Sequence, residues 1–239
     1  MKEKLYELLL QKGVADAHIK EMKATLNCGI RLLLLYYRER KTIECEVPLN
    51  KIKSLGYRGS SGLSWYDHAA GKGINIDPRR NQIAHDHLLE QPLEKFHTYY
   101  KKEYVRLIYF ADLDFYAVFG DGTHRTLWAK ITGSSTIRAE VTIAYKDHRE
   151  YELFMKKYKH SFKIKAIVQW LMNSTPNKVE SIFLAAIRGI YENKSIKTNE
   201  FGMMRVGLEL YYIQKVLSNE KNNTIVAPKF KSYNSGMKK

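Results

Sequence analysis

The sequence predicts an α+β fold in which a mixed αβ module is flanked by helical segments. Apolar residues follow helical spacing near the start of the chain and again after residue 150, while residues 109–145 show a strand, a glycine turn, a helix and a second strand. The chain has 239 residues, of which 44% are hydrophobic, so it can bury a core in one large or two small domains. The predicted parts are an N-terminal helical extension (1–42), the αβ module (43–146), a helical C-terminal domain (147–219) and a basic flexible tail (220–239).

The N-terminal extension is predicted to contain two short helices separated at Gly13. The second, over residues 15–27, places Ile19 and Met22 on one face, and Gly29 is expected to stop it. The apolar run over residues 30–38 fits a buried strand or another helix, because so short a run does not distinguish the two.

A long loop rich in Gly and Ser is predicted over residues 56–78. Long loops in compact domains are often functional, and aromatic rings beside cations suit a stacked base and its phosphate. The aromatic and basic residues of this loop are Tyr57, Arg58, Trp65, Tyr66 and Lys72. The alternative interpretation is a surface loop whose Trp65 packs back onto the core.

A helix is predicted from Ile83 to Tyr104, and it contains the triplet His85-Asp86-His87. His and Asp bind transition metals, but adjacent residues on a helix diverge by about 100° and do not face one point. We therefore predict no metal site and expect Asp86 to cap a helix.

The segment with the clearest functional pattern is a strand over Phe115–Phe119, a glycine turn and a helix that ends near Ile131. The first turn of a helix carries unpaired N–H groups and the positive end of the dipole. With His124 and Arg125 in that turn, the pattern predicts a phosphate site. The alternative is that Asp121 caps the helix and that both basic residues are simply solvated.

The region after residue 150 is predicted to be helical. The expected helices cover residues 151–159, 163–173, a stretch that begins at Ser174-Thr175-Pro176, and 200–217. The second and third could form a helix-turn-helix, but the later helix has few charged residues, which favours ordinary packing.

The chain is strongly basic, with a net charge of +15 and a pI near 9.6, and this favours a polyanionic partner such as nucleic acid. From residue 150 onward there are 16 Lys and Arg against 7 Asp and Glu, so a surplus of 9 lies there. A basic protein that stays dispersed by self-repulsion is the alternative. The predicted nucleic-acid contacts are Lys229, Lys231, Lys238 and Lys239.

Nothing in the sequence indicates a membrane protein. No apolar run approaches the roughly 18–20 residues of a membrane helix, and the start of the chain has no signal-peptide pattern. Cys28 and Cys45 lie in no metal-binding spacing. We expect a reduced, cytoplasmic protein without a membrane partner, and a homo-oligomer is left open.

Residues 43–146 resemble the ParB/sulfiredoxin-like superfamily, in which a strand ends in a D-G-x-H-R box and a helix follows. The box here runs from Asp121 to Arg125, and the segment Glu44–Lys53 is similar to the family's first strand and Pro-Leu turn. Thr123 stands where sulfiredoxins need cysteine, which argues against sulfinic-acid repair. Thr123 and His124 also depart from the G-E-R-R box of CTP-hydrolysing partition proteins, so the box is more similar to that of ParB-like nucleases and of phosphoryl-transfer relatives.

The resemblance implies a ParB-like protein that binds phosphate or nucleotide and acts on or binds nucleic acid, for example as a DNase. Two alternatives stay open: a nucleotide-dependent phosphotransferase or NTP hydrolase, and a non-catalytic binding or counter-defence protein encoded by a phage or plasmid. The cofactor is unknown, and a nucleoside triphosphate with a divalent metal ion is one hypothesis.

The resemblance also suggests roles within the box. Arg125 would stabilise a phosphoryl oxygen, His124 would bind phosphate or act as a general acid, and Asp121 would orient a nucleophile or cap the helix. No general base is identified, so catalysis stays open. The further phosphate- or nucleotide-binding candidates are Gly122, Thr123, Thr126, Tyr57 and Arg58.

Overall fold

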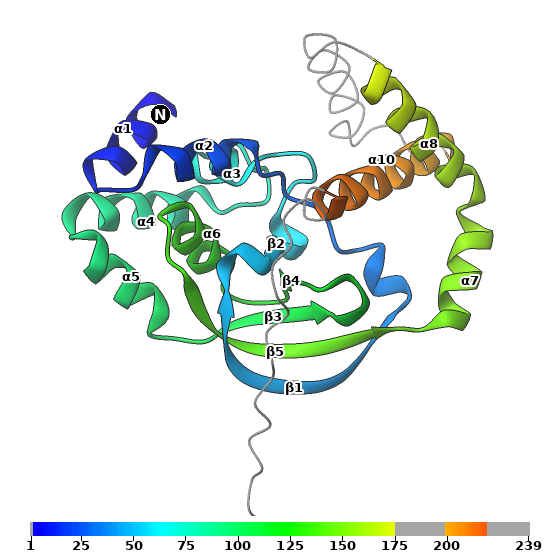
Figure 1. Ribbon diagram of the computed structural model, residues 1–239, viewed down its shortest axis with the longest axis horizontal. Helices are drawn as coiled ribbons and strands as arrows, with labels where there is room; N and C mark the ends of the chain where they lie inside the picture. The colour runs from blue at the N-terminus through cyan, green and yellow to red at the C-terminus, as the bar shows by residue number, and fades with distance from the viewer. Residues whose placement is uncertain (1, 175–198, 219–239) are drawn as a thin grey trace, which may run out of the picture.

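The computed structural model describes residues 2–174 and 199–218 (Figure 1). The helix predicted after Pro176 and the four tail lysines, Lys229, Lys231, Lys238 and Lys239, lie outside these ranges. The described helices are α1 (Lys2–Gln11), α2 (Asp16–Ala24), α3 (Trp65–Ala69), α4 (Pro78–Glu90), α5 (Leu93–Lys101), α6 (Thr123–Ile131), α7 (His148–Lys157), α8 (Lys159–Ser174) and α10 (Asn199–Ser218). Short 3₁₀ turns are η1 (Leu33–Leu35), η2 (Leu49–Lys51), η3 (Gly56–Arg58) and η4 (Ala111–Leu113).

The strands form one mixed sheet in the order β1-β5-β3-β4-β2. Neighbours β1/β5 and β3/β4 pair antiparallel, whereas β5/β3 and β4/β2 pair parallel. This mixed sheet with its helices confirms the predicted α+β class. The strands are β1 (Tyr37–Pro48), β2 (Ile52–Ser54), β3 (Val105–Phe110), β4 (Phe115–Val118) and β5 (Thr136–Lys146).

The two faces of the sheet bury different sets of helices. Alternate residues of β3 separate them: Val105 and Leu107 join the core around α6, while Ile108 and Phe110 join the core built with α7 and α10. In Figure 1, α1 to α6 gather on the left of the view, and α7, α8 and α10 lie on the right. The sheet therefore connects two groups of helices.

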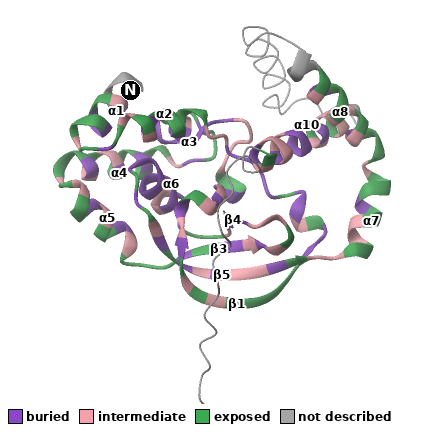
Figure 2. Ribbon diagram, viewed as in Figure 1, coloured by how far each residue is buried: buried purple, intermediate pink, exposed green. Residues whose placement is uncertain are grey.

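Helix α6 is buried on nearly every side (Figure 2). Two of its buried polar side chains, Trp128 and Lys130, have internal partners, as most buried polar groups do. The indole Nε1 of Trp128 donates to Oδ1 of Asn81 at 2.7 Å, and the ammonium of the buried Lys130 donates to the carbonyl of Ile52 and lies over the ring of Trp65. These bonds connect α6 to α4 and to the start of β2.

Several local predictions change in the structure. The stretch predicted as one helix from Ile83 is two helices, α4 and α5, because Pro92 interrupts it. Asp86 does not cap a helix; Asp77 caps α4, and its side chain accepts from the amides of Arg79 and Arg80. Sequence reasoning overlooked the Asp77-Pro78 pair, which is typical of an N-cap followed by the first helical residue.

The two predicted N-terminal helices are present as α1 and α2, but the prediction that Gly29 ends the second helix was wrong. Helix α2 ends at Ala24, and Gly29 instead lies against the carboxylate of Glu209 on α10. Residues 30–38, for which the sequence allowed either a strand or a helix, contain the 3₁₀ turn η1 and the start of β1. Within the predicted long loop, Trp65 is fully buried at the start of α3, as the alternative interpretation expected.

The link between α6 and α4 leads to a stability prediction. Asn81→Ala removes the acceptor of Trp128 Nε1 and the donor to the carbonyl of Ala69, which lies 2.7 Å from Asn81 Nδ2. We expect a loss of about 2–4 kcal/mol in the free energy of unfolding, because two buried partners are left unpaired. Urea denaturation measures it. Gln82→Ala is the control, since the amide of Gln82 donates to Asp86 at an exposed position; equal losses would contradict the prediction.

Candidate functional site

The turn before α6 is held by β3. The amide of Arg106 donates to the carbonyl of Asp121 at 3.1 Å, and the amide of Phe119 donates to the carbonyl of Arg106 at 2.8 Å. Gly122 has a φ of +96°, and a Cβ at this position would lie 2.5 Å from the Val105 side chain. A glycine is therefore needed both for the backbone conformation and for the close approach to β3.

The first turn of α6 presents backbone amides without partners. Its N-cap is Gly122, which has no side chain to accept from them, and the first hydrogen bond runs from the Thr126 amide to the Gly122 carbonyl at 2.8 Å. No acceptor for the amides of Thr123, His124 and Arg125 occurs among the described residues. Such amides, with the positive end of the helix dipole, favour an anion.

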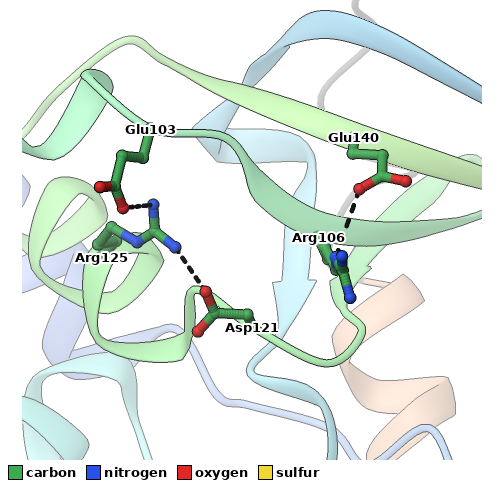
Figure 3. A network of polar contacts seen from close by, with 5 residues as sticks. All are labelled: Glu103, Arg106, Asp121, Arg125 and Glu140. Atoms are coloured by element: carbon green, nitrogen blue, oxygen red, sulfur yellow. Dashed lines mark hydrogen bonds and ion pairs between the residues drawn. The ribbon is translucent and has the colours of Figure 1, made fainter.

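Arg125 is already engaged by two carboxylates (Figure 3). Its guanidinium lies 2.7 Å from Oδ2 of Asp121 and 3.1 Å from Oε2 of Glu103, and its side chain is only 18% exposed. On the neighbouring strands, Arg106 pairs with Glu140 at 3.3 Å. Arg125 therefore stabilises the turn in this structure. An anion that binds Arg125 has to displace one of these carboxylates or bind beside it.

His124 connects the starts of two helices. Its Nε2 lies 3.2 Å from the carbonyl oxygen of Asp77, the N-cap of α4, so Nε2 carries the proton of the neutral ring. Burial lowers the pKa of His124 below its usual value, with the nearby charges of Arg58 and Arg80 as smaller causes. The ring is therefore neutral at pH 7, with its lone pair on Nδ1.

The start of the predicted long loop lies beside this turn. A Cβ on Gly56 would lie 2.0 Å from the carbonyl oxygen of Val118, so η3 runs directly along the end of β4. The rings of Tyr57 and Phe119 are 6.4 Å apart, and Arg58 is close enough to His124 to lower its pKa. The structure thus brings Tyr57 and Arg58, two candidates from the sequence, close to the box.

The two threonines proposed as phosphate contacts are buried. Thr123 is 3% exposed and Thr126 is fully buried, with a hydroxyl that has no hydrogen-bond partner in the described structure. Thr123 can therefore offer its backbone amide more readily than its side chain. Sequence reasoning missed three residues of the site, Asp77, Arg80 and Glu103, which come from other segments; only the Asp77-Pro78 pattern gave a signal.

The close approach of Gly122 to β3 generates a prediction. Gly122→Ala should cost roughly 1–2 kcal/mol for the positive φ and about 1–3 kcal/mol more for the clash with Val105. Gly120→Ala is the matched control, because Gly120 has a φ of +106° but a Cβ there would lie 3.8 Å from its nearest neighbour, the Arg106 side chain. Unfolding in urea measures both. Equal losses for the two variants would show that the approach to Val105 has no effect.

The His124 environment predicts a pH effect. Because the folded-state pKa lies below the unfolded value near 6.5, folding favours the neutral ring. The free energy of unfolding should therefore fall as the pH drops from about 6.5 through the folded pKa, and His124→Gln should reduce that fall. NMR titration of the ring, assigned with the same variant, measures the midpoint. A midpoint above 6.5 would be inconsistent with this account.

Metal-binding clusters and membrane-spanning helices do not occur in the described part of the chain. Within residues 2–174 and 199–218, no group of three or more His, Cys, Asp or Glu side chains could hold a metal ion. None of the described helices has the length and apolar character needed to cross a bilayer. Comparison of the chain with protein-family models, curated proteins and solved structures gives no match.

Proposed function

We propose that this protein binds phosphate groups of nucleic acid at the N-terminal turn of α6, on a scaffold of the ParB/sulfiredoxin-like type. The observation that carries the proposal is a convergence at one turn. The first turn of α6 has unpaired amides and carries the ring of His124, and the charges of Arg58 on η3 and Arg80 on α4 are near enough to His124 to lower its pKa. The net charge of +15 supports a polyanion as the partner.

The charges suggest how the contacts are divided. Arg58 has no carboxylate or hydrogen-bond partner among the described residues, and Arg80 has only a long contact of 3.9 Å to Asp77. Arg125, in contrast, is paired twice. In this proposal Arg58 and Arg80 contact the phosphate, the α6 amides orient it, and Arg125 positions the turn.

Hydrolysis of a phosphoester or nucleotide is the second candidate, and the state of His124 favours it. With Nε2–H donated to the Asp77 carbonyl, the neutral ring keeps a lone pair on Nδ1. That atom could accept a proton from a nucleophilic water, as a general base rather than the general acid expected from the sequence. The test of this candidate is turnover of DNA or nucleoside triphosphate with a divalent metal ion, and its loss in His124→Ala.

The proposed division of contacts predicts the behaviour of charge variants. Arg58→Ala and Arg80→Ala should weaken DNA binding and reduce the slope of log affinity against log salt by about 0.7–0.9 for each phosphate that is no longer neutralised. Fluorescence anisotropy with a labelled oligonucleotide across a salt series measures both. Arg149→Ala on α7 removes the same charge from an exposed position away from the box and is the control. If all three variants bind alike, the turn is not the phosphate site.

A further inference from the structure

Tyr57 is an exposed aromatic ring beside the candidate phosphate site. Its side chain is 46% exposed, although it lies on η3, next to the closely packed end of β4. Tyr116 on the neighbouring strand β4 is, in contrast, buried. An exposed ring on a closely packed turn is available for stacking at little cost in conformational entropy.

The backbone around Tyr57 holds the ring in place. Gly56 adopts a φ of +66° and approaches the Val118 carbonyl so closely that no side chain fits between them. The ring of Phe119 lies 6.4 Å from the ring of Tyr57 at an interplanar angle of 35°. Phe119 directly precedes the glycine turn in the chain, so the ring of Tyr57 lies beside the segment that leads into α6.

One cation lies over this ring, and a second follows it in the chain. The guanidinium of Arg31 lies 5.8 Å from the centre of the Tyr57 ring, which is near the limit of a cation–π contact. Arg58 follows Tyr57 in the chain, and its charge is near enough to His124 to lower the pKa of that ring. No ion pair involves Arg31 or Arg58 among the described residues. An exposed ring beside two arginines that form no ion pair in the described structure suits a ligand in which a flat aromatic group is attached to a phosphate.

We infer that Tyr57 stacks on an unpaired base and that the ligand of this surface is single-stranded nucleic acid. The base lies on Tyr57 beside Arg31, and its phosphate lies towards Arg58 and the α6 turn. Bases within a duplex are stacked on one another, so a fixed tyrosine ring does not reach their faces. This inference rests on the proposed phosphate site, and it adds the recognition of an unpaired base.

The test compares four labelled probes by fluorescence anisotropy: a single-stranded oligonucleotide, its duplex, an abasic strand with the same number of phosphates, and a mononucleotide. Wild type should bind the single strand more tightly than the duplex or the abasic strand. Tyr57→Ala should weaken single-strand binding by about 5- to 150-fold and leave abasic-strand binding unchanged. Tyr57→Phe keeps the ring and should bind as wild type does. Tyr145→Ala, with a tyrosine of 49% exposure on β5, is the control.

The outcomes separate this inference from the function on which it rests. If Arg58→Ala weakens the abasic strand while Tyr57→Ala leaves the single strand unaffected, phosphate binding stands and base stacking is wrong. If neither Arg58→Ala nor Arg80→Ala alters any probe, the phosphate site itself is wrong. If the mononucleotide binds more tightly than the single strand, single-stranded nucleic acid is not the ligand. A free nucleotide then supplies the base and the phosphate that this surface binds.

Discussion

The burial of α6 is the constraint on which the rest of the structure depends. Unpaired polar groups are costly in a helix enclosed by the sheet and by α2 to α5, so the polar groups of α6 that are paired determine the positions of their neighbours. The indole of Trp128 requires Asn81 of α4, and the ammonium of Lys130 requires the carbonyl of Ile52 at the start of β2. Because these partners lie in different segments, the axis of α6 is fixed relative to both.

A fixed axis also fixes the first turn of α6, where the candidate site lies. Gly122 approaches Val105 so closely that the turn cannot move along β3 without a clash, and His124 bonds to the N-cap of α4. The site therefore combines amides from α6 with side chains from η3 and α4 on a framework held by core packing. Preorganised donors of this kind lose little entropy when they bind an anion.

The parts of this site that could be predicted from the sequence are those formed by residues that are consecutive in the chain. The strand, glycine turn and helix around Gly122 follow from local pattern, and so does the charge in the box. The contribution of Arg80 could not be predicted, because it depends on where α4 docks against α6. The pairing of Arg125 with Glu103 likewise arises from the packing of the segment after α5 beside the turn, and no spacing in the sequence reports that contact.

The double pairing of Arg125 changes what the box contributes to affinity. Asp121 and Glu103 are 67% and 78% exposed, so their attraction to Arg125 is screened by water and each pair contributes little to stability. Their negative charge nevertheless offsets the cation that the D-G-x-H-R pattern supplies. In the proposed function, attraction of a polyanion would therefore come mainly from Arg58, Arg80 and the wider positive surplus, and the box would mainly fix the position of the phosphate. Mutation of Arg125 is therefore expected to act mainly by disturbing the turn, whereas mutation of Arg58 is expected to act mainly by removing positive charge.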